Sequence, residues 1–178
     1  EGIFYVDNSP VAVEIENGII KKFERLNKLS DNNEHYFIAP GLIDIQINGY
    51  SGVSFALDGA DNTSEGSAGL TVADVRKVTE GLWKEGVTSY LPTLTTNSKE
   101  LLLKNFEVLA GAMNDQSIPG SIAGFHLEGP YISSVDGYRG AHPREHVRKP
   151  DWGEFVEFNH AAGGKILIVT LAPETDGA

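Results

Sequence analysis

The chain has 178 residues, enough for one domain with a real hydrophobic core, and its composition is that of an ordinary globular protein. It contains no cysteine, which excludes disulfides and thiolate chemistry and favours a reducing, cytoplasmic compartment. The net charge of −11 argues against nucleic-acid or anionic-membrane partners, and no apolar run approaches the roughly 20 residues that cross a bilayer.

The first 38 residues predict a small β unit. Residues 11–15 alternate apolar and polar side chains, Asn17-Gly18 follows, and residues 19–23 form a second such run. Asn-Gly between two runs of this kind is a strong signal for a β-hairpin. A short apolar run at 36–38 adds one more candidate strand. A unit of this size is too small to be stable alone, so we expect it to need partner strands from elsewhere.

The rest of the chain alternates strands with helices. Strands are predicted over 42–47, 87–91, 122–127 and 165–171, and helices over 71–85, 98–113 and 152–162. Thr71 and Ser98 are the expected N-caps, and Pro92 is expected to end the second strand. The nearly continuous apolar run of the first strand predicts burial on both faces. This alternation is typical of parallel β/α units.

Polar side chains occur where the predicted strands end. They are Gln46 and Asn48 after the first strand, Thr93, Thr95 and Thr96 after the second, His126 and Glu128 after the third, and Glu174 after the fourth. The carboxyl ends of parallel strands meet at one edge of the sheet, where active sites of such folds are found. The sequence therefore predicts a functional site at this edge.

His126 and Glu128 are the most informative pair. They are two residues apart on one strand, so their side chains point to the same face, and Gly129-Pro130 stops the strand directly afterwards. An imidazole and a carboxylate in this position suit metal binding or acid/base chemistry. The alternative is a satisfied ion pair or hydrogen-bonded pair inside the fold.

Five segments, taken in order, resemble the N-acetylglucosamine-6-phosphate deacetylase family of the metal-dependent amidohydrolase superfamily. They are residues 39–49, 86–93, 126–130 (His-Leu-Glu-Gly-Pro), 140–143 (Gly-Ala-His-Pro) and 171–174. The resemblance implies an α/β fold, a (β/α)8 TIM barrel of amidohydrolase type flanked by a small β-sandwich. Residues 1–38 would form part of the sandwich, and residues 39–178 the first half of the barrel, about four β/α units.

The same resemblance implies an enzyme that hydrolyses the acetamide of N-acetylglucosamine 6-phosphate, giving glucosamine 6-phosphate and acetate. It assigns Glu128 as a metal ligand and Ala141 and His142 as substrate contacts. One divalent metal is implied, zinc first, with iron, cobalt or manganese also suited to a carboxylate. The resemblance also suggests a homodimer. His126 matches no family ligand and is kept as a supporting or structural residue.

Gln46 and Asn48 stand where most amidohydrolases carry His-x-His. Carboxamides are poorer ligands than imidazoles for a zinc-like ion, so we predict a one-metal site. The two amides would hydrogen-bond a water molecule or the substrate; the alternative is that they only cap a strand end.

A basic loop is the expected partner of the substrate phosphate. It contains Arg139, His142, Arg144, His146, Arg148 and Lys149 in an otherwise acidic protein. The alternative is a solvated charged loop, and that interpretation is favoured for Arg148 and Lys149. His142 is the member favoured for binding.

A barrel of this kind takes about 250 residues and eight strands, more than this chain supplies. The family's two histidine ligands and catalytic aspartate would then lie beyond Ala178. We therefore expect the chain to be the amino-terminal half of a longer polypeptide, inactive by itself. Two other functions stay open: another amidohydrolase, such as a deaminase or cyclic-amide hydrolase, and a non-catalytic sugar-phosphate binding domain.

Overall fold

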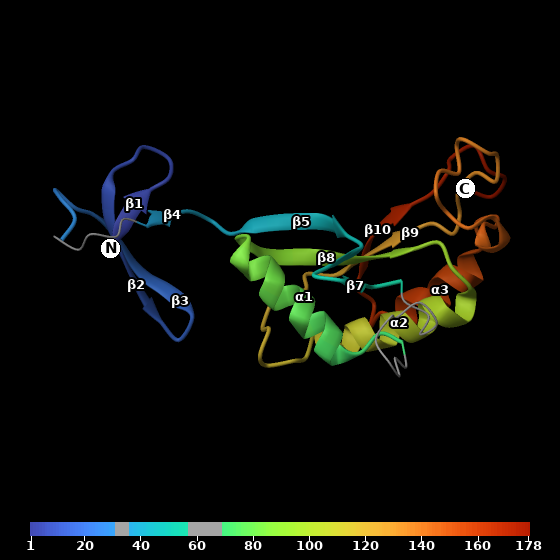
Figure 1. Ribbon diagram of the computed structural model, residues 1–178, viewed down its shortest axis with the longest axis horizontal. Coiled ribbons are helices and arrows are strands. Elements are labelled where there is room, and N and C mark those ends of the chain that lie inside the picture. Colours follow the sequence, from blue (N-terminus) through green and yellow to red (C-terminus); the bar gives the residue numbers. More distant parts are fainter. Residues whose placement is uncertain (31–35, 57–68) are drawn as a thin grey trace. The chain divides into compact units, whose positions relative to one another are not determined.

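The structure is a computed structural model that describes residues 1–30, 36–56 and 69–178. The chain divides into two compact units, Glu1–Gly41 and Leu42–Ala178 (Figure 1). Most of the polar segment that precedes the first predicted helix, residues 57–68, lies outside the described residues.

The first unit is a four-stranded sheet in the order β3-β2-β1-β4. Its strands are β1 (Gly2–Phe4), β2 (Pro10–Glu16), β3 (Ile19–Arg25) and β4 (Phe37–Ile38). The predicted hairpin is confirmed: β2 and β3 pair antiparallel, and Asn17 and Gly18 have φ values of 52° and 75°. Both angles are positive, as a type I′ turn requires. The three-residue β1 was not predicted, because it is too short to show an alternating pattern.

Apolar side chains of this first sheet remain exposed. Ile15, Ile19 and Ile20 are each more than half exposed, whereas Val11 is fully buried. Ile15 and Ile20 are cross-strand partners on one face of the sheet, and Ile19 points to the other face. Exposed apolar side chains of this kind are usually covered by another layer or a partner. The exposure agrees with the expectation that the unit needs partner strands, and its assignment to a β-sandwich stays a prediction.

The second unit is built on a parallel sheet in the order β10-β9-β8-β5. The elements in chain order are β5 (Leu42–Ile47), the short pair β6 (Gly49–Tyr50) and β7 (Val53–Ser54), α1 (Val72–Lys84), β8 (Val87–Thr95), α2 (Lys99–Ala112), β9 (Phe125–Glu128), η1 (Arg144–His146), α3 (Trp152–Ala161) and β10 (Ile166–Thr170). The predicted alternation of parallel strands with helices is confirmed.

The helices begin where the sequence predicts them. Thr71 caps α1 in a capping box with Asp74, and Ser98 caps α2 by accepting a hydrogen bond from the backbone of Leu101. Asp151 caps α3 in the same way. Such side chains satisfy backbone N–H groups that have no partner inside the helix. None of the helices among the described residues is both long enough and apolar enough to span a bilayer.

The core lies between the sheet and the three helices, which run along one face of it (Figure 1). Its members include Val75, Val78 and Leu82 from α1, Leu102, Phe106 and Leu109 from α2, Phe158 from α3, and Tyr90, Leu94, Phe125 and Leu127 from the strands. Burying each large apolar side chain contributes about 1.5–3 kcal/mol. This layer fixes the strands, and therefore the residues at their carboxyl ends.

Two strand predictions are wrong in detail. The second strand does not end at Pro92, because β8 continues to Thr95. The pairing of β5 with β8 shifts register between Asp44 and Ile47, and Pro92 pairs with Ile47, so its missing N–H falls where the ladder is irregular. Because of this extension, Thr95 is the last residue of β8 and lies where the parallel strands have their carboxyl ends.

The predicted burial of β5 on both faces is also wrong. Ile43 is 70% exposed, and Leu42 and Ile45 are more than half exposed. Among the described residues, β5 pairs only with β8, so it is an edge strand of the sheet. Because β5 has a neighbouring strand on one side only in the described sheet, its side chains are less covered than those of an interior strand.

Candidate functional site

A cavity of about 510 Å³ lies at the carboxyl ends of the parallel strands. Asn48 after β5, Thr95 of β8, Glu128 of β9 and Thr170 of β10 all line it, together with the loop residues 138–143. All four strands therefore contribute a polar residue to one cavity. This is the edge of the sheet where the sequence predicts a functional site.

Glu128 is the last residue of β9, and its side chain is only 18% exposed. One carboxylate oxygen, Oε1, lies 3.8 Å from Nε2 of His142. The other oxygen, Oε2, is buried and accepts no hydrogen bond from any residue that the structure describes. A buried carboxylate oxygen without a partner is costly, so this atom is well suited to bind a cation.

Gly129 lets the chain turn directly after Glu128. Its φ is +79°, and a Cβ at this position would collide with Oγ1 of Thr96. Only glycine combines this backbone conformation with such a close approach. The chain therefore passes close to Thr96, directly after β8, as it leaves β9.

His142 faces Glu128 from the loop that follows β9. Its Nδ1 lies 2.9 Å from Oγ1 of Thr96, so the end of β8 fixes the ring. Arg139 donates hydrogen bonds to the carbonyl oxygen of His142 and, over 2.8 Å, to Oδ1 of Asp136. These contacts close the loop on itself and hold Ala141 and His142 in the wall of the cavity.

His126 lies below the cavity and does not line it. It is 4% exposed, its Nε2 is 2.8 Å from Oγ1 of Thr170, and its Nδ1 is 3.5 Å from Oγ1 of Thr93. The ring therefore connects β8, β9 and β10 just under the residues at their ends. Its surroundings fit the supporting role considered for it from the sequence.

The two strand-end amides lie in different surroundings. Asn48 lines the cavity, whereas Gln46 is exposed outside its lining, and its backbone N–H donates to Oδ1 of Asp44 over 2.9 Å. Glu174, the strand-end residue after β10, lines a different cavity of about 390 Å³. The structure therefore brings only some of the predicted strand-end residues into one cavity.

The interpretation of Arg148 as a solvated loop residue is wrong. Its side chain is only 28% exposed and forms an ion pair with Glu154 over 2.9 Å. Lys149 does match that interpretation, since its side chain is 73% exposed and pairs with the still more exposed Asp176. Two adjacent basic residues thus differ because one points inward and the other into solvent.

Several cavity residues were not singled out from the sequence. Thr170 ends β10 and Tyr138 lies in the loop before His142. Thr170 could have been found, because it is the one polar residue at the end of the run Ile-Leu-Ile-Val. The contact of Thr96 with His142 spans 46 positions and has no local sequence signal.

The described residues supply only part of a metal site. They contain no cluster of three histidine, cysteine, aspartate or glutamate side chains placed to hold an ion. A catalytic zinc needs about three protein ligands, so Glu128 fits as one ligand of a larger set. The implied single divalent metal stays a prediction.

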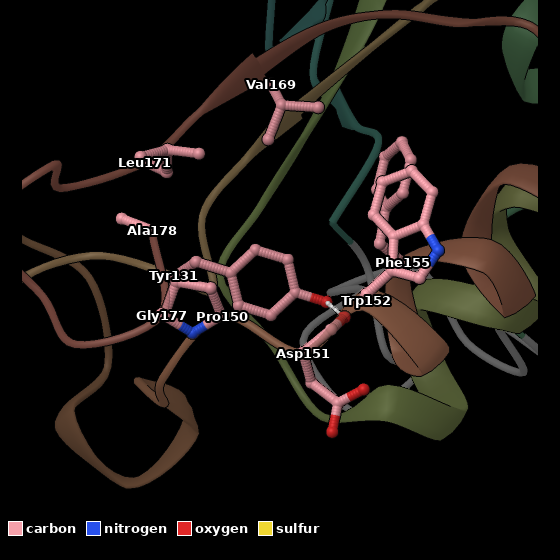
Figure 2. A pocket seen from close by; sticks show the side chains of 9 residues that line it. All are labelled: Tyr131, Pro150, Asp151, Trp152, Phe155, Val169, Leu171, Gly177 and Ala178. Atoms are coloured by element: carbon pink, nitrogen blue, oxygen red, sulfur yellow. Dashed lines mark hydrogen bonds between the residues drawn. The ribbon is translucent and has the colours of Figure 1, made fainter.

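A third cavity, of about 240 Å³, lies beside the start of α3 (Figure 2). Its walls are mostly apolar and include Tyr131, Trp152, Phe155 and Leu171. In Figure 2 the hydroxyl of Tyr131 points at the carbonyl oxygen of Asp151, which it donates to over 3.4 Å. This lining suits an apolar side chain better than a phosphorylated sugar.

Comparison with known proteins gives one consistent result. The chain is 36% identical over 148 residues to the N-acetylglucosamine-6-phosphate deacetylase of Caenorhabditis elegans, covering 82% of this chain and 33% of that protein. It is 34% identical over 142 residues to the deacetylase of Bacillus subtilis, covering 78% and 32%. The chain thus spans about a third of the length of the curated relatives that it matches. No protein-family model matches the chain.

Solved structures of the same enzyme have the same fold. The deacetylase from Pasteurella multocida superposes with a TM-score of 0.74 at 25% identity, over 98% of this chain and 44% of that chain. The Mycobacterium smegmatis deacetylase gives 0.71 at 27% identity, over 93% and 40%. A variant of the latter was solved in complex with N-acetyl-D-glucosamine-6-phosphate. The parallel sheet and helices of the second unit therefore form part of a TIM barrel.

Proposed function

We propose that the full-length protein carrying this chain hydrolyses the acetamide of N-acetylglucosamine 6-phosphate to glucosamine 6-phosphate and acetate. The observation that carries the proposal is the unpartnered Oε2 of Glu128 beside His142 in a cavity formed by the strand ends. The similarity to deacetylases along most of this chain supports the assignment.

Glu128 would hold the divalent metal, which when bound polarises the amide carbonyl and activates a water molecule. The metal is proposed to be zinc, although iron, cobalt or manganese would also accept a carboxylate. Because the described residues provide no complete ligand set, the remaining ligands and the catalytic aspartate would come from elsewhere in the full-length protein.

His142 and the backbone of Ala141 would contact the sugar from the wall of the cavity. The hydrogen bond between His142 and Thr96 keeps the imidazole oriented while the substrate enters and leaves. Asn48 is placed to hydrogen-bond a water molecule or the substrate, whereas the exposed Gln46 is less well placed. We also propose a cytoplasmic homodimer, on the absence of cysteine and on the family resemblance.

The test is acetate release by the purified full-length protein. We expect turnover of N-acetylglucosamine 6-phosphate and little or none of purine or N-carbamoyl substrates, which probe the other amidohydrolase activities. Metal analysis of the same sample should find about one divalent ion per chain. A metal-loaded protein that binds the sugar phosphate without releasing acetate would contradict the proposal and favour a binding domain.

A further inference from the structure

Arg148 makes an unusual number of contacts for a loop residue. Its Nε lies 3.0 and 2.9 Å from the two carboxylate oxygens of Glu154, in the first turn of α3. Its Nη1 donates to the carbonyl oxygens of Asn97 and His146 over 3.0 and 2.7 Å. Its backbone N–H donates to the carbonyl oxygen of Pro130 over 3.1 Å.

The partners of Arg148 are direct neighbours of the site residues. Pro130 comes two positions after Glu128, and Asn97 directly follows Thr96, the hydrogen-bond partner of His142. One side chain and its backbone therefore join the beginning and the later part of the loop after β9 to the segment after β8. This loop carries His142 and starts directly after Glu128, and the segment after β8 contains Thr96.

The pair of Arg148 with Glu154 anchors this arrangement to a helix. The Glu154 side chain is only 11% exposed, and it also accepts a hydrogen bond over 2.9 Å from the hydroxyl of Tyr131. Tyr131 is 3% exposed, so the contact lies within the packed interior. A guanidinium can hold a carboxylate and several carbonyl oxygens at once, which a lysine ammonium on a flexible stem does less well.

We propose that Arg148 is a positioning residue for the site: it holds the loop after β9 so that His142 stays opposite Glu128. It acts through the carbonyl oxygens of Asn97, Pro130 and His146 and touches neither substrate nor metal. The kinetic consequence rests on the proposed deacetylase function, whereas the effect on the loop does not.

The structural test compares Arg148→Gln with Lys149→Gln in the full-length protein, by amide hydrogen exchange. Lys149→Gln removes the same charge from the adjacent position, but its side chain reaches only the exposed Asp176. We expect faster exchange of residues 129–147 in Arg148→Gln, with α2 unchanged, and no such change in Lys149→Gln. Equal exchange in the two variants would overturn the proposal.

The kinetic test measures kcat/KM on N-acetylglucosamine 6-phosphate well below the unfolding temperature. Displacing a catalytic geometry by about 1 Å can cost about 100-fold, so we expect a 10- to 100-fold loss for Arg148→Gln and less than about twofold for Lys149→Gln. If Arg148 only stabilises the fold, Arg148→Gln will lower the unfolding temperature and leave kcat/KM of the folded enzyme unchanged.

Arg148→Lys is the second variant, to be used if Arg148→Gln does not fold. The ammonium can keep the pair with Glu154 but cannot also reach both carbonyl oxygens, so exchange of residues 129–147 should still rise. Full recovery of exchange protection and kcat/KM by lysine would contradict the proposal. If the wild-type protein shows no turnover, the proposed deacetylase function is refuted but the role of Arg148 is not. The hydrogen-exchange comparison would still decide that role.

Discussion

At the scale of single residues, Glu128 combines a strand end, a glycine turn and a buried oxygen that has no hydrogen-bond donor among the described residues. A buried carboxylate oxygen without a donor is unfavourable unless a cation or another group of the full-length protein compensates it. Nε2 of His142 lies 3.8 Å from Oε1, the other oxygen of this carboxylate, which is too far for a hydrogen bond. The geometry of Glu128 therefore fits the metal-ligand role proposed for it.

Replacing Glu128 with glutamine should separate binding of the metal from folding. The amide keeps the shape of the side chain but loses its negative charge, so we expect a large loss of bound metal and a loss of turnover of at least about 100-fold. Metal analysis and acetate release from the full-length protein are the measurements. Retention of metal and activity in Glu128→Gln would exclude Glu128 as a ligand.

Thr96→Val should test how His142 is held. Valine has the shape of threonine without the hydroxyl, so the bond to Nδ1 of His142 is lost while the buried site stays filled. A single hydrogen bond of this kind contributes about 0.5–1.5 kcal/mol, so we expect kcat/KM to fall roughly 2- to 10-fold. Thr88→Val, at an exposed position of β8 outside the cavity, is a control for the substitution itself, and equal losses in the two variants would contradict a specific role for Thr96.

At the scale of elements, α1 and α2 are joined by an ion pair at their ends. Arg76 of α1 donates to Oδ2 of Asp115 over 2.9 and 2.6 Å, just beyond α2. The backbone N–H and the hydroxyl of Ser117 donate to Oδ1 over 2.9 and 2.7 Å. The hydrogen bonds from Ser117, followed by that from Arg76, lower the pKa of Asp115 to about 2.

This pKa predicts how the stability of α1 and α2 depends on pH. The pKa of Asp115 is lower in the folded state than the roughly 3.9 of an unfolded chain, so its contribution is present at pH values above about 4. It is lost as the pH falls toward about 2, because the unfolded state then binds the proton first. Asp115→Asn should therefore be less stable than the wild type at pH 6 and approach it at pH 3.

Urea unfolding of both proteins at pH 6, 5, 4 and 3 would measure this difference in free energy. Glu107→Gln removes an exposed carboxylate from α2 and controls for the change in net charge. A difference between Asp115→Asn and wild type that stays constant across this range would show that the ionised Asp115 does not stabilise the fold.

At the scale of the whole molecule, apolar side chains are exposed on the two edge strands of the sheet described for the second unit. They are Leu42, Ile43 and Ile45 on β5 and Leu167 on β10. Exposed apolar side chains on edge strands favour association with other chains. The full-length relatives are about three times as long as the matched stretch, which gives room for further strands.

The 178-residue chain produced alone should bind a hydrophobic dye and self-associate. Ile43→Thr combined with Ile45→Thr should reduce both effects, because it makes the exposed face of β5 more polar while keeping β-branched side chains. Dye fluorescence and light scattering are the measurements, and Ala73→Ser on the exposed surface of α1 is the control. A monomeric chain that binds no dye would contradict the expectation.

The sequence predicted the fold well where the signals are local. The hairpin around Asn17-Gly18, the capping residues Thr71 and Ser98 and the end of β9 at Gly129 are all confirmed, because each depends on the chemistry of a few adjacent residues. The extension of β8 through Pro92 was missed, because a proline is tolerated there only through an irregularity of the neighbouring strand.

By itself, the sequence determined the order of strands and helices and placed polar residues at the strand ends, since side-chain periodicity and turn chemistry depend on residues that are close in the sequence. Only the tertiary structure decided which of those residues share a cavity. It placed Asn48, Thr95, Glu128 and Thr170 together, left Gln46 and Glu174 out, and turned Arg148 inward while Lys149 stayed in solvent. These outcomes depend on how distant segments pack, and no pattern of neighbouring residues records such contacts.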